Sequence, residues 1–178
     1  MKVFTLNGPK MANVAFAFLC MTIIVYVGFL NHHTVVVTAT ITPTVPIALV
    51  VDGFGTGQSG TREFLYMDIA FSGIVDNTAP WAAEDERLLN ASGKEIFTDI
   101  MEIDFETIHI DGIGDISEIE ENLRRAVEQA KNDGFGVIVA RLGVNGGVHS
   151  ANAINNIYRE IDNIEFVTIS DLRERIES

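Results

Sequence analysis

Two loops of the sequence contain residues whose types can take part in catalysis. The first spans residues 52–60 (DGFGTGQSG) and begins with Asp52, directly after the apolar run 46–51. The second spans residues 141–149 (RLGVNGGVH) and ends with His149. A carboxylate at the end of a buried strand can bind a metal ion or act as a general base. It can equally cap its own loop by accepting backbone hydrogen bonds, and both interpretations of Asp52 stay open.

Asp52 and His149 form a site only if the two loops meet in space. In parallel α/β folds, ligands bind where loops follow the carboxyl ends of strands, and we expect both loops at that edge. A site rebuilt from Asp52 and His149, with Asp111 as a third member, would combine a metal ligand with an acid–base group. A purely structural pairing is the alternative. His109 lies between two isoleucines, so we expect it to be half-buried and structural.

Three glycines of the first loop match the pattern G-x-G-x-x-G of dinucleotide-binding sites. Gly55, Gly57 and Gly60 lie between a predicted strand and a predicted helix, and Asp76 ends the next strand. In such sites the glycines admit a pyrophosphate to a helix N-terminus, and the acidic residue binds a ribose. The carboxylate of Asp52 would repel those phosphates, and the predicted helix is short. We therefore favour a glycine loop without nucleotide and keep a Rossmann-like domain as a minor alternative.

The elements that must position these loops alternate between strand and helix. Short apolar runs predict strands, and apolar residues at helical spacing predict helices. The clearest helix is 117–133, where Ser117 and Glu120 form a capping box and Gly134 ends the helix. We also predict strands at residues 46–51, 69–75, 95–101, 135–140 and 164–169, and helices at 61–67, at 81–91, and at starts capped by Ser150 and Ser170. This order indicates an α/β fold, a mostly parallel sheet with flanking helices.

The composition narrows the classes of partner. The chain has 178 residues, enough for one domain, and 47% of them are hydrophobic, which excludes a wholly disordered chain. All 25 acidic residues lie at or after Asp52, where only ten basic residues accompany them. Such a negative surface repels phosphate backbones, so we expect no nucleic-acid partner. Cys20 is the single cysteine, which excludes an internal disulfide and a cysteine-based zinc site.

The first 45 residues predict a membrane anchor followed by a linker. Residues 11–30 contain no charged side chain, and as a helix they would span roughly 30 Å, the thickness of a bilayer core. Two lysines precede this span, and no basic residue follows it before Arg62, so the positive-inside rule places the N-terminus in the cytoplasm. The expected organisation is a cytoplasmic segment at residues 1–10, a transmembrane anchor at 11–30, a Thr-rich tether at 31–45 and an extracytoplasmic domain at 46–178.

Two stretches of the body resemble one protein family. Residues 47–75 read IALVVDGFGTGQSGTREFLYMDIAFSGIV, and residues 134–172 read GFGVIVARLGVNGGVHSANAINNIYREIDNIEFVTISDL. They are similar, in order and spacing, to the opening and closing segments of the divergent polysaccharide deacetylases, bacterial relatives of the NodB-type carbohydrate esterases. The resemblance implies a distorted β/α barrel, truncated here, that removes N-acetyl groups from a cell-wall glycan with a divalent metal such as zinc. It implies the bacterial cell membrane as the location, and Asp52 as a catalytic and metal-binding position.

Several positions depart from the pattern of that family. Asp52 is followed by Gly53 where the family has two adjacent aspartates, and Ala140-Arg141 stands where the family has glycine and histidine. The central segment, which holds further catalytic positions in full-length members, is absent. Of the catalytic positions, the resemblance carries over Asp52 alone. It therefore implies a shortened, degenerate member in which hydrolysis is impaired or lost.

Two hypotheses about function follow from these observations. One is a membrane-anchored, hydrolase-like protein of carbohydrate metabolism. The other is a non-catalytic module that binds cell-wall glycan or a partner protein. Trp81, beside Pro80, can stack on a sugar face or fill a core or lid position. Because a barrel that lacks strands has an open sheet edge, which must be covered, paired or charged, we also expect either a homodimer or a bound partner at that edge.

Overall fold

The computed structural model of the chain describes residues 44–111, 115–143 and 146–178. These residues fall within one compact unit, Thr42–Ser178. The predicted cytoplasmic segment, the transmembrane anchor at 11–30 and nearly all of the tether lie outside the described residues. None of the helices in the described part is long and apolar enough to cross a bilayer.

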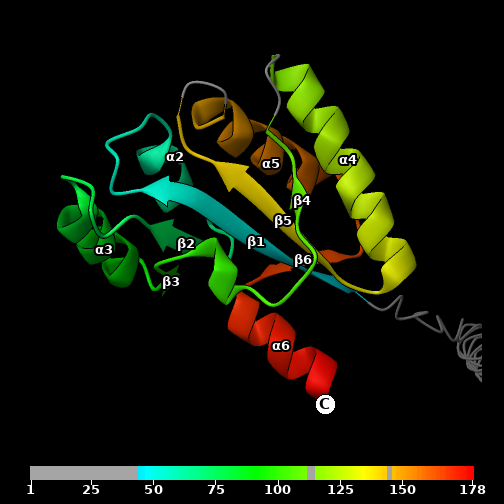
Figure 1. Cartoon of the computed structure of the whole chain (residues 1–178). Coiled ribbons are helices and arrows are strands. Elements are labelled where there is room, and N and C mark those ends of the chain that lie inside the picture. The colour runs from blue at the N-terminus through cyan, green and yellow to red at the C-terminus, as the bar shows by residue number, and fades with distance from the viewer. Residues whose placement is uncertain (1–43, 112–114, 144–145) are drawn as a thin grey trace, which may run out of the picture. The chain divides into compact units, whose positions relative to one another are not determined.

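Six strands form one sheet: β1 (Val45–Phe54), β2 (Ser72–Val75), β3 (Glu95–Phe97), β4 (Ile108–His109), β5 (Gly136–Arg141) and β6 (Ile164–Val167). Their order is β3-β2-β1-β5-β4, with β6 paired to β1 beside that path, and each pairing is parallel (Figure 1). The predicted α/β fold with a mostly parallel sheet is confirmed. The sheet is open, however, and the barrel implied by the resemblance is not formed: among the described strands, β3 and β4 each pair with one neighbour only.

The sheet is centred on β1, which pairs with three other strands. Along one edge of β1, β5 pairs with the segment from Ile47 to Asp52. The opposite edge is divided, because β6 pairs with Val45 to Ala48 while β2 begins its pairing at Val50. β1 is therefore the strand that aligns the loops at the carboxyl ends of β2 and β5.

Helices cover both faces of the sheet, because the side chains of a strand alternate between its faces. The helices are α2 (Thr61–Leu65), α3 (Ala82–Ala91), α4 (Ile116–Asp133), α5 (Val148–Glu160) and α6 (Ile169–Glu177), with a short 3₁₀ helix η1 (Ile100–Glu102). Ile47 and Leu49 of β1 belong to the core that includes α4 and α5. Ala48 and Val50 belong to a second core on the other face, which includes Leu172 of α6. Figure 1 shows α6 apart from α4 and α5, across the sheet.

The carboxylate of Glu95 connects the start of β2 to the segment that follows β6. Ser72 Oγ donates a hydrogen bond to Glu95 Oε2 at 2.5 Å, and the N–H of Ile169 donates to the same oxygen at 2.9 Å. Because backbone N–H groups at a helix N-terminus favour negative charge, Glu95 stabilises the start of α6. The N-cap of α6 is Thr168 in place of the predicted Ser170.

The start of α4 also differs from its prediction. Its N-cap is Asp115, whose carboxylate accepts a hydrogen bond from the Ser117 N–H at 3.0 Å, in place of the predicted Ser117. Ser150, the predicted cap of the next helix, lies inside α5, which begins at Val148. The two differences shift a helix cap by two residues for α4 and by three for α5, and they leave each helix in the predicted place.

Candidate functional site

Asp52 lies beside Arg141 because β1 and β5 are paired in register. The two residues are direct partners across the strands, and Arg141 Nε donates a hydrogen bond to Asp52 Oδ2 at 3.2 Å. On the other side of Asp52, Ile74 and then Phe97 continue the same row across β2 and β3. The side chains of Arg141 and Asp52 are 60% and 28% exposed, so the ion pair is open to solvent at the carboxyl ends of the strands.

The ion pair decides how well Asp52 suits a metal. A catalytic zinc ion needs about three protein ligands and an open position for water. The guanidinium of Arg141 already bonds one oxygen of Asp52, so a metal cation at this carboxylate would meet a positive charge. Within residues 44–111, 115–143 and 146–178, no three His, Cys, Asp or Glu side chains form a group that can hold a metal ion. Asp52 and its neighbours thus do not supply the donor set that zinc prefers.

The histidines of the sequence prediction are not joined to Asp52. His149 is the exposed second residue of α5, and its backbone N–H donates to the Gly146 carbonyl at 3.1 Å. No hydrogen bond links His149 to Asp52 among the residues that the structure describes. His109 is exposed at the end of β4, so the expectation of a half-buried position is wrong. The catalytic roles assigned to Asp52 and His149 stay predictions.

Asp111 connects the end of β4 to α5. Its Oδ1 accepts a hydrogen bond at 2.6 Å from the hydroxyl of Ser150, a fully buried residue. Burial raises the pKa of the Asp111 carboxyl above its ordinary value, while the hydrogen bond from Ser150 and the positive charge of Arg141 offset part of that rise. The contact fastens the segment after β4 to the first turn of α5, which is a structural role.

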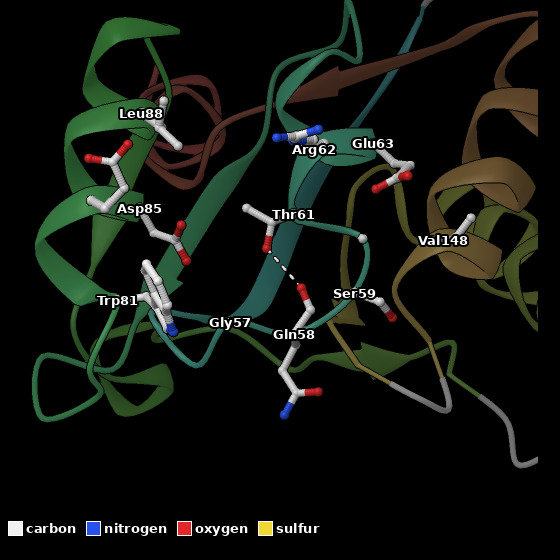
Figure 2. A pocket seen from close by; sticks show the side chains of 12 residues that line it. Gly57, Gln58, Ser59, Thr61, Arg62, Glu63, Trp81, Asp85, Leu88 and Val148 are labelled. Carbon is white, nitrogen blue, oxygen red and sulfur yellow. Dashed lines mark hydrogen bonds between the residues drawn. The ribbon is translucent and has the colours of Figure 1, made fainter.

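A pocket of about 560 Å³ lies between the first glycine loop and α3 (Figure 2). Residues 57–63, one face of α3 and Val148 of α5 line this pocket. Figure 2 shows Trp81 and Asp85 on the side of α3 that faces the loop carrying Gly57. The Asp52–Arg141 pair is not part of the lining. The volume is that of a small-molecule site, so the pocket is a stronger candidate for binding than the ion pair.

One face of α3 supplies both an aromatic and an acidic wall. Trp81, Asp85 and Leu88 recur at intervals of four and three residues, so they project from the same side of the helix. Trp81 is 58% exposed, whereas Asp85 is only 6% exposed. Asp85 Oδ2 accepts a hydrogen bond from the Gly55 N–H at 2.7 Å, which fixes the carboxylate against the loop. Trp81 is a candidate that the sequence predicts, whereas Asp85 is not.

Close packing accounts for the glycines of the first loop. A Cβ atom at Gly57 would lie 2.8 Å from Trp81 Cδ1, and a Cβ atom at Gly60 would clash with the backbone of Gly147. Both glycines have positive φ angles, +68° and +101°, which other residues rarely adopt. The helix that follows, α2, has only five residues. Contacts within the protein therefore account for glycine at both positions.

Comparison with protein-family models finds no match for this chain, and comparison with curated proteins finds none either. The resemblance to the divergent polysaccharide deacetylases therefore stays a prediction made from the sequence. The function proposed below is based on the residues that line the pocket.

Proposed function

We propose that residues 46–178 form a non-catalytic module that binds glycan in the pocket beside Trp81. Residues 11–30 would anchor this module in a bacterial cell membrane, with the pocket outside the cytoplasm and facing the cell wall. The observation that carries the proposal is the exposed indole of Trp81 at the edge of a pocket that polar residues such as Thr61 and Asp85 also line.

The chemistry of a sugar suits this combination of groups. A pyranose ring presents a face of C–H groups that packs on an aromatic ring, and a rim of hydroxyls that needs hydrogen-bond partners. In the pocket, Trp81 offers the aromatic surface, while Thr61 offers a hydroxyl and Asp85 a carboxylate. Thr61 Oγ1 donates its own proton to the Gln58 carbonyl at 3.1 Å, so its oxygen is free to accept a hydrogen bond from a sugar hydroxyl.

The surroundings of Asp52 favour binding over hydrolysis. Removal of an acetyl group through a metal requires an activated water and an acid for the leaving amine. The one catalytic position carried over by the resemblance, Asp52, is bonded to Arg141 and lies outside the lining of the pocket. We therefore assign a binding role to the pocket and no reaction to Asp52.

The test is a comparison of two aromatic substitutions. For Trp81→Ala, we expect the affinity for β-1,4-linked N-acetylglucosamine or glucosamine tetramers to fall by at least about tenfold, the effect of losing one stacked ring. The matched control is Tyr66→Ala, because Tyr66 is an exposed aromatic residue outside the pocket, and its loss should leave affinity unchanged. Affinity is measured by calorimetry on the full chain in a detergent without a sugar headgroup. Equal affinities for the wild type and Trp81→Ala would overturn the proposal.

A further inference from the structure

We propose that the pocket selects a sugar that carries a free, protonated amino group, as in a glycan from which N-acetyl groups have been removed. This inference rests on the proposed function and names the class of sugar that the pocket prefers. It depends on Asp85, on Trp81 and on the balance of charge around them.

Asp85 presents a carboxylate oxygen that is free for a ligand. The residue is 6% exposed, and its Oδ2 is already bonded to the Gly55 N–H at 2.7 Å. Its Oδ1 accepts no hydrogen bond within the described part of the chain. No fully buried side-chain oxygen or nitrogen there lacks a partner, so Oδ1 keeps some solvent-accessible surface, and Asp85 is one of the residues that line the pocket. A carboxylate that is fixed and largely shielded from water binds a cation more strongly than an exposed one.

Trp81 adds a second group that favours a cation. It lies one helical turn before Asp85, and both line the pocket from α3 (Figure 2). The face of an indole ring attracts an ammonium group through its quadrupole, and tryptophan is the best side chain for this contact. An ammonium bound between the two residues would contact the ring and donate a hydrogen bond to Asp85 Oδ1. A neutral acetamide would gain neither the ion pair nor the cation–π contact.

The other charged residues that line the pocket include more acidic than basic side chains. Besides Asp85, the pocket is lined by the carboxylates of Glu63 and Glu84 and by one guanidinium, that of Arg62. Glu84 is bonded to Arg87 at 2.7 Å, and this hydrogen bond lowers the pKa of Glu84, so Glu84 stays ionised. Arg87 offsets the charge of Glu84, so the negative charge that attracts an amino sugar and repels an acidic one such as a uronic acid comes mainly from Asp85 and Glu63.

Three tetrasaccharides with the same β-1,4 linkage test the inference on the wild-type full chain in a detergent without a sugar headgroup. They are the tetramers of glucosamine, of N-acetylglucosamine and of glucose, compared by calorimetry at a pH where the amine is protonated. We expect the glucosamine tetramer to bind at least about tenfold more tightly than the other two, the effect of one charge-assisted contact. Equal binding of all three would overturn the inference and leave the proposed function standing. Absence of binding by all three would overturn both.

A pair of charge-neutralising substitutions on α3 tests the role of Asp85 itself. In Asp85→Asn the amide oxygen can still accept the hydrogen bond from Gly55, and we expect the preference for glucosamine to fall below about threefold. Glu86→Gln removes the same charge from an exposed residue outside the lining, and the preference should persist. A similar loss in both variants would show that the general field of the protein, rather than Asp85, selects the cation. That result would overturn the assignment. Because the wild-type comparison needs no variant, the inference stays testable if Asp85→Asn fails to fold.

Discussion

At the scale of single residues, the carboxylate of Asp52 shows how a neighbour changes the chemistry open to a group. The sequence places Asp52 at the end of an apolar strand, where a metal ligand or a general base is a sound expectation. Register then pairs it with Arg141, whose guanidinium lies 3.2 Å from Asp52 Oδ2. Strand register depends on contacts between residues almost ninety positions apart, which no local pattern reveals.

A zinc titration tests the state of Asp52. Because Arg141 holds a positive charge against the carboxylate, we expect zinc to bind the full chain no more tightly than it binds Asp52→Ala. Calorimetry on both proteins, prepared in the same detergent, measures the difference. A tight one-to-one site that is present in the wild type and lost in Asp52→Ala would contradict this prediction and restore the hydrolase hypothesis.

The pKa of Asp111 predicts an unusual pH dependence of stability. Because burial raises its pKa in the folded state, the folded protein binds this proton more tightly than the unfolded chain does. The free energy of unfolding contributed by Asp111 is therefore greatest in acid and falls as the pH rises through the folded pKa. In Asp111→Asn the amide still accepts the hydrogen bond from Ser150 but does not titrate. We expect the wild type to lose stability relative to Asp111→Asn as the pH rises above about 4, the ordinary pKa of an aspartate.

Urea unfolding at several pH values measures this trend, and Asp76→Asn is the control of opposite sign. Thr78 donates hydrogen bonds to Asp76 and lowers its pKa, so the stabilising contribution of Asp76 is present at neutral pH and lost as the pH falls. For each variant, the quantity compared is the free energy of unfolding of the wild type minus that of the variant. If this difference changes with pH in the same direction for Asp111→Asn and Asp76→Asn, the account of Asp111 is wrong.

Asp85 was beyond the sequence analysis for a different physical reason. It lies in the acidic run 84–86, which is typical of a solvated helix face. One local signal was available: Asp85 follows Trp81 by four residues, and both share a helix face with Leu88. What places that face against the first loop is the tertiary contact between Gly55 and Asp85, and residue types alone do not predict it.

At the scale of elements, strongly periodic segments were predicted well and short ones less well. The helix predicted at 117–133 is α4, because five apolar residues follow its period and Gly134 ends it. The strand predicted at 95–101 ends at Phe97, because Asp99 begins η1 with a capping box to Glu102. A cap contact of this kind overrides a short apolar run.

The contact between the two glycine loops predicts a large effect of a small substitution. In Gly60→Ala, the methyl group would clash with the backbone of Gly147, and the φ angle of +101° would add strain. We expect the free energy of unfolding to fall by about 3 kcal/mol. Gly93→Ala is the matched control, because Gly93 has a φ angle of +66° with no atom within 4 Å of the added methyl group. We expect the free energy of unfolding of Gly93→Ala to fall by about 1 kcal/mol, the effect of the φ angle alone.

Urea unfolding of the two alanine variants separates packing from backbone strain. If Gly60→Ala loses no more stability than Gly93→Ala, the two loops are not held in close contact, and the first loop is free to move away from the second.

At the scale of the whole molecule, the alternation of strands and helices was sufficient to predict the α/β class but not the shape of the sheet. The number of strands and the identity of the edges depend on long-range pairings such as β6 with β1. Among the described strands, β3, β4 and β6 each pair with one neighbour and leave an edge open, and they have three, two and four residues. A barrel would have closed these edges, whereas an open sheet leaves their backbone groups available to a second chain.

The open sheet and the acidic surface make a joint prediction about association. We predict a homodimer through a sheet edge, with a protein mass twice 19.5 kDa by light scattering after correction for bound detergent. Because each chain carries a net charge of −13, repulsion opposes the dimer, and added salt should strengthen it. A mass of 19.5 kDa at micromolar concentration, in low and in high salt, would exclude the dimer.

The three-way pairing of β1 has a consequence for how the protein is made. On a ribosome, β1 emerges early, yet its partners β5 and β6 are synthesised roughly a hundred residues later. Until then its apolar side chains and free backbone groups have no native partners beyond those of β2, so this strand is exposed to misassembly during synthesis. The sheet can be completed only after Val167 has been added, so the native pairings of β1 cannot all form until nearly all of the described residues have been synthesised.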